Sequence, residues 1–241
     1  MERETRLVHA GRAPEGHEGA VSPPVYRAST ILYPTMAAYE KRNERVYASY
    51  GYGIHGTPTT MALAEALAEL SGGARTLLLS SGLSAVTQAL SAFLRKDDHL
   101  LIADTVYGPT RVFCTEVLRR YGVEVTFYDP LAGVGIADLM RPATRVVYLE
   151  SPGSQTFEVQ DVPAIAASAR ARGALVFLDN TWATPLHFRA FEHGVDVEIQ
   201  ALTKFVAGHS DLLLGAVTTR TEELYRVARD GASTFGDCPA P

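Results

Sequence analysis

The stretch Val176-Phe177-Leu178-Asp179-Asn180-Thr181-Trp182 guides our interpretation of the whole chain. An apolar run that ends in an acid is typical of a buried parallel strand at its carboxyl end. A second strand-like run, 195–199, leads through Gln200 to Lys204. Ligands of open α/β sheets bind at the carboxyl edge of the strands, so we expect Asp179 and Lys204 to face one site.

A carboxylate and an amine at one sheet edge suit pyridoxal phosphate (PLP). The aldehyde of PLP forms a Schiff base with a lysine, and an acid beside the ring nitrogen keeps that nitrogen protonated. Each residue also has a simpler explanation. An Asp after a strand is often the N-cap of the next helix, and a Lys near apolar residues usually extends its amine to solvent. The hypothesis therefore needs a phosphate-binding turn and a group that stacks on the ring.

The composition narrows the class of protein. Of the 241 residues 46% are hydrophobic, which is enough for a sizeable core. No apolar run approaches the ~18 residues of a membrane span, and no signal-peptide core follows the N-terminus. A net charge of −5 without a basic stripe argues against nucleic acid as a partner. Cys114 and Cys238 suggest neither a disulfide framework nor a metal cluster, so we expect a reducing cytoplasm and no metal.

Residues 1–60 differ in character from residues 61–241. The first segment is rich in proline and tyrosine and lacks a clean helical or strand period. It is too apolar for a disordered tail, so we expect an arm that lies on another surface, such as a neighbouring subunit. An Ala/Leu-rich helix predicted over 59–70 ends at Gly72-Gly73, a typical C-terminal signal.

Strands and helices then alternate, which is the pattern of right-handed crossovers and a largely parallel sheet. We predict one α/β domain with a mostly parallel, seven-stranded sheet. Its expected strands lie near 75–80, 99–104, 123–128, 144–150, 174–179, 195–200 and 212–218, and its expected helices near 82–94, 108–121, 161–172 and 221–230. The segment 231–241 follows the last helix without a closing element, as a flexible tail or a linker to a further domain does.

The turn Ser80-Ser81-Gly82-Leu83-Ser84 lies between a predicted strand and a predicted helix. Gly82 would let the backbone approach a ligand, and free amides at a helix start favour an anion such as phosphate. The hydroxyl of Thr203 could bind the same phosphate. Tyr107 follows another strand end, where a flat ring can cover a pyridine ring. An ordinary turn and a packing tyrosine are the alternatives at these two places.

These residues lie in motifs that resemble the Cys/Met-metabolism family of PLP-dependent enzymes, which has the aspartate-aminotransferase fold (fold type I). The motifs cover essentially the whole chain: 5–12, 52–59, 81–83, 104–107, 150–154, 179–185 and 203–211. The resemblance implies that Lys204 carries PLP, that Asp179 pairs with the ring nitrogen and that Tyr107 stacks on the ring. Lys204 and Tyr107 are the implied catalytic residues. The implied phosphate ligands are Gly82, Leu83, Thr203 and, from a neighbouring subunit, Tyr52.

Ser154, which we place among the cofactor-binding residues, stands where many members have Asn, and Trp182 stands where many have Phe. Both choices resemble the cystathionine β-lyase branch. The resemblance then implies a carbon–sulfur lyase that converts L-cystathionine to homocysteine, pyruvate and ammonia in transsulfuration and methionine biosynthesis. The alternatives are γ-elimination or γ-replacement by the same family, or a truncated, non-catalytic PLP-binding protein. Such enzymes are usually homotetramers made of two dimers.

Two features depart from the family. Ile54 stands where an arginine commonly pairs with the cofactor phosphate, and His55 or Arg45 are the candidate replacements. Relatives also continue into a C-terminal small domain, which carries the arginine that binds the substrate carboxylate. No residue here can be given that role. We therefore expect the small domain to be absent and this chain to be an incomplete, weakly active form.

Overall fold

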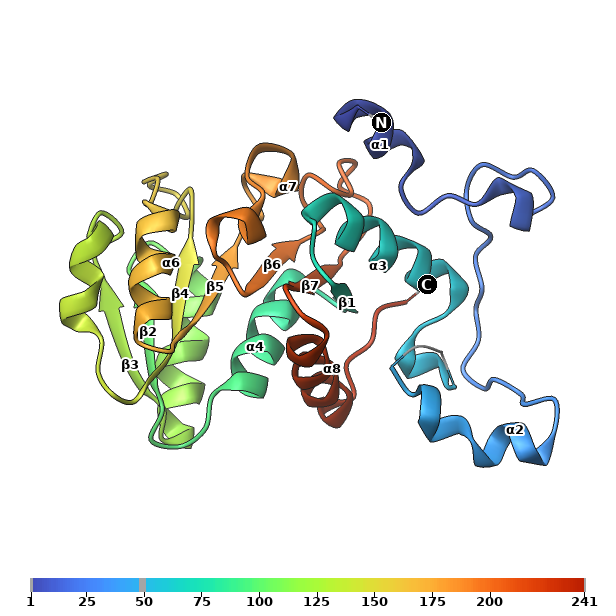
Figure 1. The fold of residues 1–241 in the computed structure, drawn as a ribbon, viewed down its shortest axis with the longest axis horizontal. Coiled ribbons are helices and arrows are strands. Elements are labelled where there is room, and N and C mark those ends of the chain that lie inside the picture. Colours follow the sequence, from blue (N-terminus) through green and yellow to red (C-terminus); the bar gives the residue numbers. More distant parts are fainter. Residues whose placement is uncertain (1, 48–50, 241) are drawn as a thin grey trace.

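A seven-stranded sheet forms the centre of the molecule in a computed structural model, which describes residues 2–47 and 51–240 (Figure 1). In sheet order the strands are β1 (Arg75–Leu79), β7 (Gly215–Thr219), β6 (Val197–Ala201), β5 (Leu175–Asp179), β4 (Thr144–Glu150), β2 (His99–Ala103) and β3 (Glu124–Tyr128). Strand β7 pairs antiparallel with β1 and β6, and all other neighbours pair in parallel. The predicted α/β fold is confirmed.

Helices cover both faces of this sheet. Helices α4 (Gly82–Phe93) and α8 (Glu222–Phe235) pack against each other on one face, and α3 (Pro58–Ser71) lies on the other (Figure 1). Leu78 and Ala216 form a small cluster with α3, whereas their neighbours Leu79 and Val217 join the main core with α4 and α8. Side chains alternate along a strand, so this division places α3 and α4 on opposite faces.

The remaining helices are α1 (Arg3–His9), α2 (Met36–Glu40), α5 (Gly108–Val112), α6 (Val162–Ala171) and α7 (Thr184–His187). Several helix starts follow from local sequence. Thr57 caps α3 in a capping box with Thr60, and Pro58 follows at the first helical position. Gly72 ends α3 with a φ of 72°, a left-handed conformation that glycine adopts without strain. The predicted end of this helix is therefore confirmed.

Three elements differ from the predictions by more than two residues or in helix type. The strand predicted over 212–218 begins only at Gly215, because the apolar run before it lies at the surface, with Leu213 73% exposed. Helix α8 continues past residue 230 to Phe235, where Gly236 provides the left-handed cap. The helix predicted over 108–121 changes its hydrogen-bond spacing at residue 113, where α5 passes into a π-helical segment.

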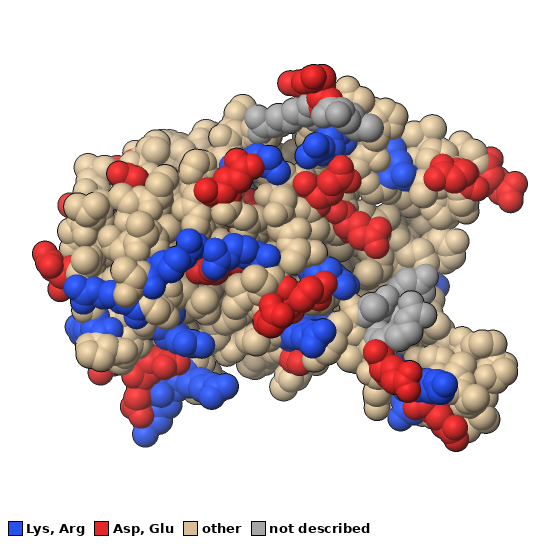
Figure 2. Space-filling view, viewed as in Figure 1, with Lys and Arg blue, Asp and Glu red and all other residues tan. Residues whose placement is uncertain are grey.

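The N-terminal arm packs loosely on the sheet domain and extends past α3 (Figure 1). Among its described side chains none before Thr57 is fully buried, and Leu32 and Met36 are largely exposed. Side chains of both charge signs are interspersed over the face drawn in Figure 2. No helix of the described residues is long and apolar enough to cross a membrane. The subunit-contact role of the arm stays a prediction.

Candidate active site

Three neighbouring parallel strands, β4, β5 and β6, end at one edge of the sheet. Glu150 and Asp179, the last residues of β4 and β5, are register partners, and Asp179 is paired with Ile199 of β6. The chain leaves β6 in a turn in which the Lys204 amide donates to the carbonyl of Ala201 at 3.1 Å. The Lys204 side chain is exposed. The strand ends therefore carry the predicted acid and amine to a common edge.

Two acids lie side by side at this edge. Asp179 is only 8% exposed, and burial raises the pKa of its carboxyl even though Thr181 hydrogen-bonds to it, with N···Oδ1 at 3.0 Å. Burial, together with the charge of Asp179, raises the pKa of Glu150 to about 8. Within residues 2–47 and 51–240 neither carboxyl forms a salt bridge. This acid pair therefore favours a protonated donor as its ligand.

Glu150 has a second contact that gives it a positioning role. Its Oε2 accepts a hydrogen bond of 2.7 Å from the backbone amide of Tyr107, just before α5. The Tyr107 side chain remains 48% exposed. Our sequence analysis gave Glu150 no role, although its place at a strand end next to Asp179 was a usable signal. The contact links the predicted stacking residue to the acid pair.

Gly82 begins α4 where that helix meets the end of β6. A Cβ at position 82 would lie 2.4 Å from the Cβ of Ala201 and 2.9 Å from its Cα, which no real side chain allows. The hydroxyl of Ser81 caps the helix by accepting the amide of Ser84 at 3.1 Å. Gly82 is therefore required by packing within the chain, a reason different from the ligand approach we expected. The start of α4 is thereby held beside the turn that carries Lys204.

This combination of an acid pair, a helix start and an exposed lysine agrees with a sequence comparison. The sequence model of the Cys/Met metabolism PLP-dependent enzymes matches residues 4–241. The chain belongs to this family. PLP is the cofactor that the family requires, and the uncompensated acid pair and the glycine-dependent helix start fit its ring nitrogen and its phosphate. Among the described residues, no cluster of three or more His, Cys, Asp or Glu side chains could hold a metal ion.

Relatives within the family include several lyases. A putative cystathionine β-lyase of Rhizobium johnstonii is 49% identical over 98% of the chain, and cystathionine β-lyase MetC of Escherichia coli is 42% identical over 88%. The crystal structure of cystathionine γ-lyase from Lactobacillus plantarum, complexed with L-serine, matches the whole chain with a TM-score of 0.91 and 29% identity. The chain spans 59%, 54% and 61% of the lengths of these three proteins.

Thr203 and Ser154 already have partners within the chain. The Thr203 hydroxyl donates to the Leu214 carbonyl at 3.2 Å and accepts the Leu214 amide at 3.1 Å, which closes the loop from β6 to β7. The Ser154 amide donates to the Thr105 carbonyl at 2.8 Å and so ties the loop after β4 to the loop after β2. The predicted phosphate contact of Thr203 thus has an intramolecular competitor, and the cofactor contacts of both residues stay predictions.

Three aromatic rings pack together, one of them from Phe205, the residue that follows Lys204. Trp182 packs against Phe157 with ring centroids 5.3 Å apart and against Phe205 at 5.2 Å. Each ring is slightly more than half exposed. The rings come from the loops after β4, β5 and β6, so they join the three segments that supply Glu150, Asp179 and Lys204. Our sequence analysis noted Trp182 only as a branch marker and missed these contacts.

Tyr52, Ile54 and His55 belong to the arm segment that the resemblance places on the cofactor phosphate. In this structure they do not lie among the residues of the sheet edge described above. Tyr52 is 52% exposed and lies in a hollow lined by other arm residues, including Tyr33 and Tyr39. Ile54 and His55 line a pocket together with Arg229, a residue that our sequence analysis missed. The side chain of Arg45, the other candidate replacement for the phosphate-binding arginine, lies outside the part of the chain that the structure describes. The role of Tyr52 toward a neighbouring subunit stays a prediction.

Proposed function

We propose that the protein is a PLP-dependent carbon–sulfur lyase that splits L-cystathionine by β-elimination into homocysteine, pyruvate and ammonia. The observation that carries this proposal is the acid pair of Asp179 and Glu150, without a salt-bridge partner among the described residues, at the same sheet edge as the exposed Lys204. The names of the two relatives with 49% and 42% identity support β-elimination over other reactions of the family. This activity belongs to transsulfuration and methionine biosynthesis.

The site residues would divide the work as follows. When bound, PLP supplies an electron sink for the negative charge that develops on the substrate Cα. Lys204 would hold the cofactor through its amine, and the free amine would be the base that accepts the proton from Cα. Asp179 would stabilise the protonated ring nitrogen. Glu150 fixes the backbone of Tyr107, whose ring stacks on the cofactor and keeps water away.

The phosphate would be held by the start of α4 and by residues around it. Amides at a helix start and the helix dipole favour an anion. The proposed ligands at this position are the amides of Gly82 and Leu83, the hydroxyl of Thr203, and Tyr52 from a second subunit, while Ser154 is proposed to contact the cofactor elsewhere. We accordingly propose that residues 1–60 are an arm for subunit contacts, that 61–241 form the PLP-binding domain, and that the enzyme is a cytoplasmic dimer of dimers.

Product analysis tests the reaction. β-Elimination of L-cystathionine yields pyruvate, whereas γ-elimination yields 2-oxobutyrate. The similarity to the γ-lyase structure keeps γ-elimination as the second candidate. We expect pyruvate and homocysteine in equal amounts, and no product from the Lys204→Ala variant. Formation of 2-oxobutyrate instead would overturn β-elimination. PLP binding without any product would favour a non-catalytic PLP-binding protein.

A further inference from the structure

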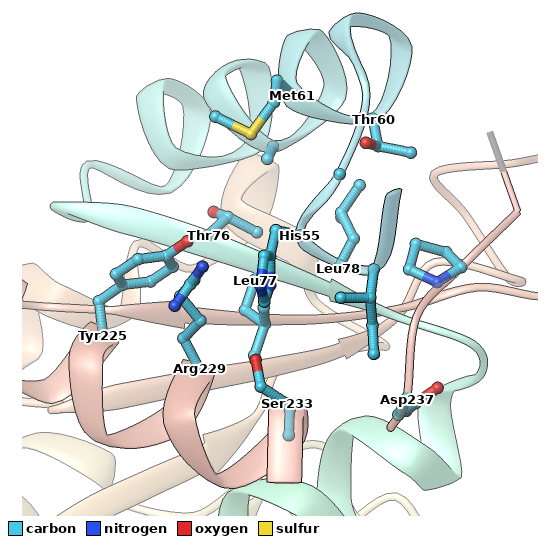
Figure 3. Close-up of a pocket in the computed structure, with 15 residues that line it drawn as sticks. His55, Thr60, Met61, Thr76, Leu77, Leu78, Tyr225, Arg229, Ser233 and Asp237 are labelled. Carbon is cyan, nitrogen blue, oxygen red and sulfur yellow. The ribbon is translucent and has the colours of Figure 1, made fainter. Parts of the chain in front are cut away.

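A pocket at the outer edge of β1 lies between α3 and α8, and none of the residues proposed above to bind PLP lines it. It is bounded by the 3₁₀ turn Gly53–His55, by α3, β1 and α8, and by the segment after α8 (Figure 3). About 40 Å³ is open to the centres of water-sized molecules. A single water needs roughly 10–15 Å³ by this measure, so the pocket has room for about three waters or one small oxyanion. We call it the Arg229 pocket.

The Arg229 side chain brings a positive charge into this pocket. Arg229 is 6% exposed, and its Nη2 is buried without a hydrogen-bond partner among the described residues. Its Nη1 lies 3.7 Å from the exposed carboxylate of Asp230, and its guanidinium carbon lies 4.9 Å from the ring centroid of Tyr47. The Asp230 carboxylate also accepts the Tyr47 hydroxyl at 2.7 Å. A buried guanidinium with an unused N–H is unfavourable unless a ligand fills the position.

A second unused polar atom lies in the same pocket. Nδ1 of His55 is buried and has no partner in the part of the chain that the structure describes. Burial and the charge of Arg229 lower the pKa of this imidazole. Figure 3 shows the ring of His55 and the guanidinium of Arg229 near each other, although they come from the arm and from α8. Each residue therefore brings one nitrogen atom without a partner among the described residues to the lining of this pocket.

The other charged group that lines the pocket is Asp237, and it is already bound. Its carboxylate accepts the hydroxyl of Ser84 and the amide of Ser80, the latter at 3.3 Å, at the start of α4. Tyr225, the remaining titratable group, lies under the guanidinium of Arg75 at 4.6 Å from its ring centroid. The Asp237 carboxylate keeps its charge, because its partners are neutral, so the formal charges of Arg229 and Asp237 balance. What the pocket offers an anion is two unused nitrogen atoms.

We propose that the Arg229 pocket binds a small oxyanion, a carboxylate or phosphate group, between Arg229 and His55. The guanidinium donates from Nη2 and the imidazole donates from Nδ1 in its protonated form or its Nδ1–H tautomer. Binding of an anion favours the charged imidazole, so it raises the pKa of His55 and strengthens at lower pH. The pocket is next to the start of α4 through Asp237, but no residue given a role in the proposed reaction lines it, so the proposal does not depend on the reaction catalysed.

The experiment follows the imidazole C–H resonances of His55 by NMR during titration with inorganic phosphate or with acetate at constant ionic strength. We compare the wild-type chain with Arg229→Gln and with the control Arg226→Gln. Arg226 is on the same helix, is exposed and also faces the Tyr47 ring at 5.1 Å, but it does not line the pocket. His55 is assigned from the spectrum of His55→Gln.

We expect a saturable shift of His55 and an upward change of its pKa in the wild type and in Arg226→Gln. In Arg229→Gln the affinity should fall about tenfold or more, since a charge-assisted hydrogen bond is lost. The stronger of the two titrants identifies the group as phosphate or carboxylate. Absence of a saturable shift, or equal affinity in Arg229→Gln, would mean that water alone fills the pocket. If Arg229→Gln does not fold, Arg229→Lys replaces it: the forked guanidinium is gone, so unchanged affinity would also overturn the proposal.

Discussion

Buried carboxyl groups on the neighbouring strands β6 and β5, those of Glu198 and Asp179, differ in their hydrogen-bond partners. Glu198, in the middle of β6, is 1% exposed and accepts a hydrogen bond of 2.5 Å from Nδ2 of Asn180, which also donates to the Phe188 carbonyl at 2.9 Å. Asp179, at the end of β5, receives hydrogen bonds from Thr181 alone among the described residues and lies beside a second acid. We infer that Glu198, which has an amide partner within the chain, stabilises the fold. The pair of Asp179 and Glu150, which has no cation beside it among the described residues, is suited to binding a ligand.

Because Glu198 is assigned a structural role, we expect Glu198→Gln to change the free energy of unfolding strongly and to leave PLP binding unchanged. Burial raises the pKa of Glu198 from 4.5 to about 7. The folded state therefore holds this proton more tightly than the unfolded state. The resulting stability is fully present below about pH 4.5 and is lost as pH rises through about 7. At ~1.4 kcal/mol per pH unit, the loss amounts to about 3 kcal/mol at pH 8.

Glu198→Gln should remove this loss, because the amide stays neutral and its oxygen still accepts from Asn180. Urea unfolding between pH 4.5 and 8 should show the variant more stable than the wild type at pH 8 and similar to it at pH 4.5. Glu65→Gln, an exposed position on α3, serves as the control and should change little. If Glu198→Gln instead weakened PLP binding, Glu198 would not be purely structural, and the contrast drawn between Glu198 and Asp179 would be wrong.

Asp179→Asn should act mainly on the cofactor; because burial raises the pKa of Asp179 too, the apoprotein of this variant should be no less stable than the wild type at neutral pH. The protonated ring nitrogen loses a charge-assisted hydrogen bond, which contributes roughly 1.5–3 kcal/mol, so PLP affinity should fall about ten- to hundredfold. Absorbance titration of the apoprotein measures the dissociation constant. Asp161→Asn is the matched control, since Asp161 caps α6 and Asn caps equally well. Equal dissociation constants in all three proteins would contradict the role of Asp179.

Glu150→Gln should have the smallest effect of the three. The glutamine oxygen still accepts the Tyr107 amide, so only the repulsion between Glu150 and Asp179 disappears. We expect PLP affinity to change by less than about tenfold, because no hydrogen bond to the cofactor is lost. The same absorbance titration decides the point. A loss larger than that of Asp179→Asn would place Glu150, and not Asp179, on the ring nitrogen.

The sequence predicted the residues at strand ends better than those inside strands. An apolar run marks a buried strand, and the polar residue after it marks the carboxyl edge, which is how Asp179 and Lys204 were found. Glu198 interrupts such a run, and nothing in its surroundings distinguishes a buried carboxyl from one that faces solvent. Its partner Asn180 comes from another strand end, 18 residues away. Contacts of this kind depend on the register between strands, which local patterns do not specify.

The same limit explains what was missed around the proposed site. Turn chemistry identified Gly82, but the close approach of Ala201 that requires it depends on how α4 meets β6. The phosphate contact expected of Thr203 stays a prediction, but the bonds of its hydroxyl to Leu214 across a loop were not indicated by the sequence. Arg229 lies on an amphipathic helix, where an arginine is expected at the surface. Only the packing of the arm and α8 shows that it is buried.

Covalent attachment of PLP to Lys204 is the central claim, and borohydride reduction of the PLP-loaded protein tests it most directly. The chain contains three lysines, Lys41, Lys96 and Lys204, so peptide mapping by mass spectrometry gives an unambiguous answer. We predict one pyridoxyl group per chain, on Lys204, and none in Lys204→Ala treated in the same way. A label on Lys41 or Lys96, or an equal label in Lys204→Ala, would contradict the assignment of this sheet edge as the PLP site.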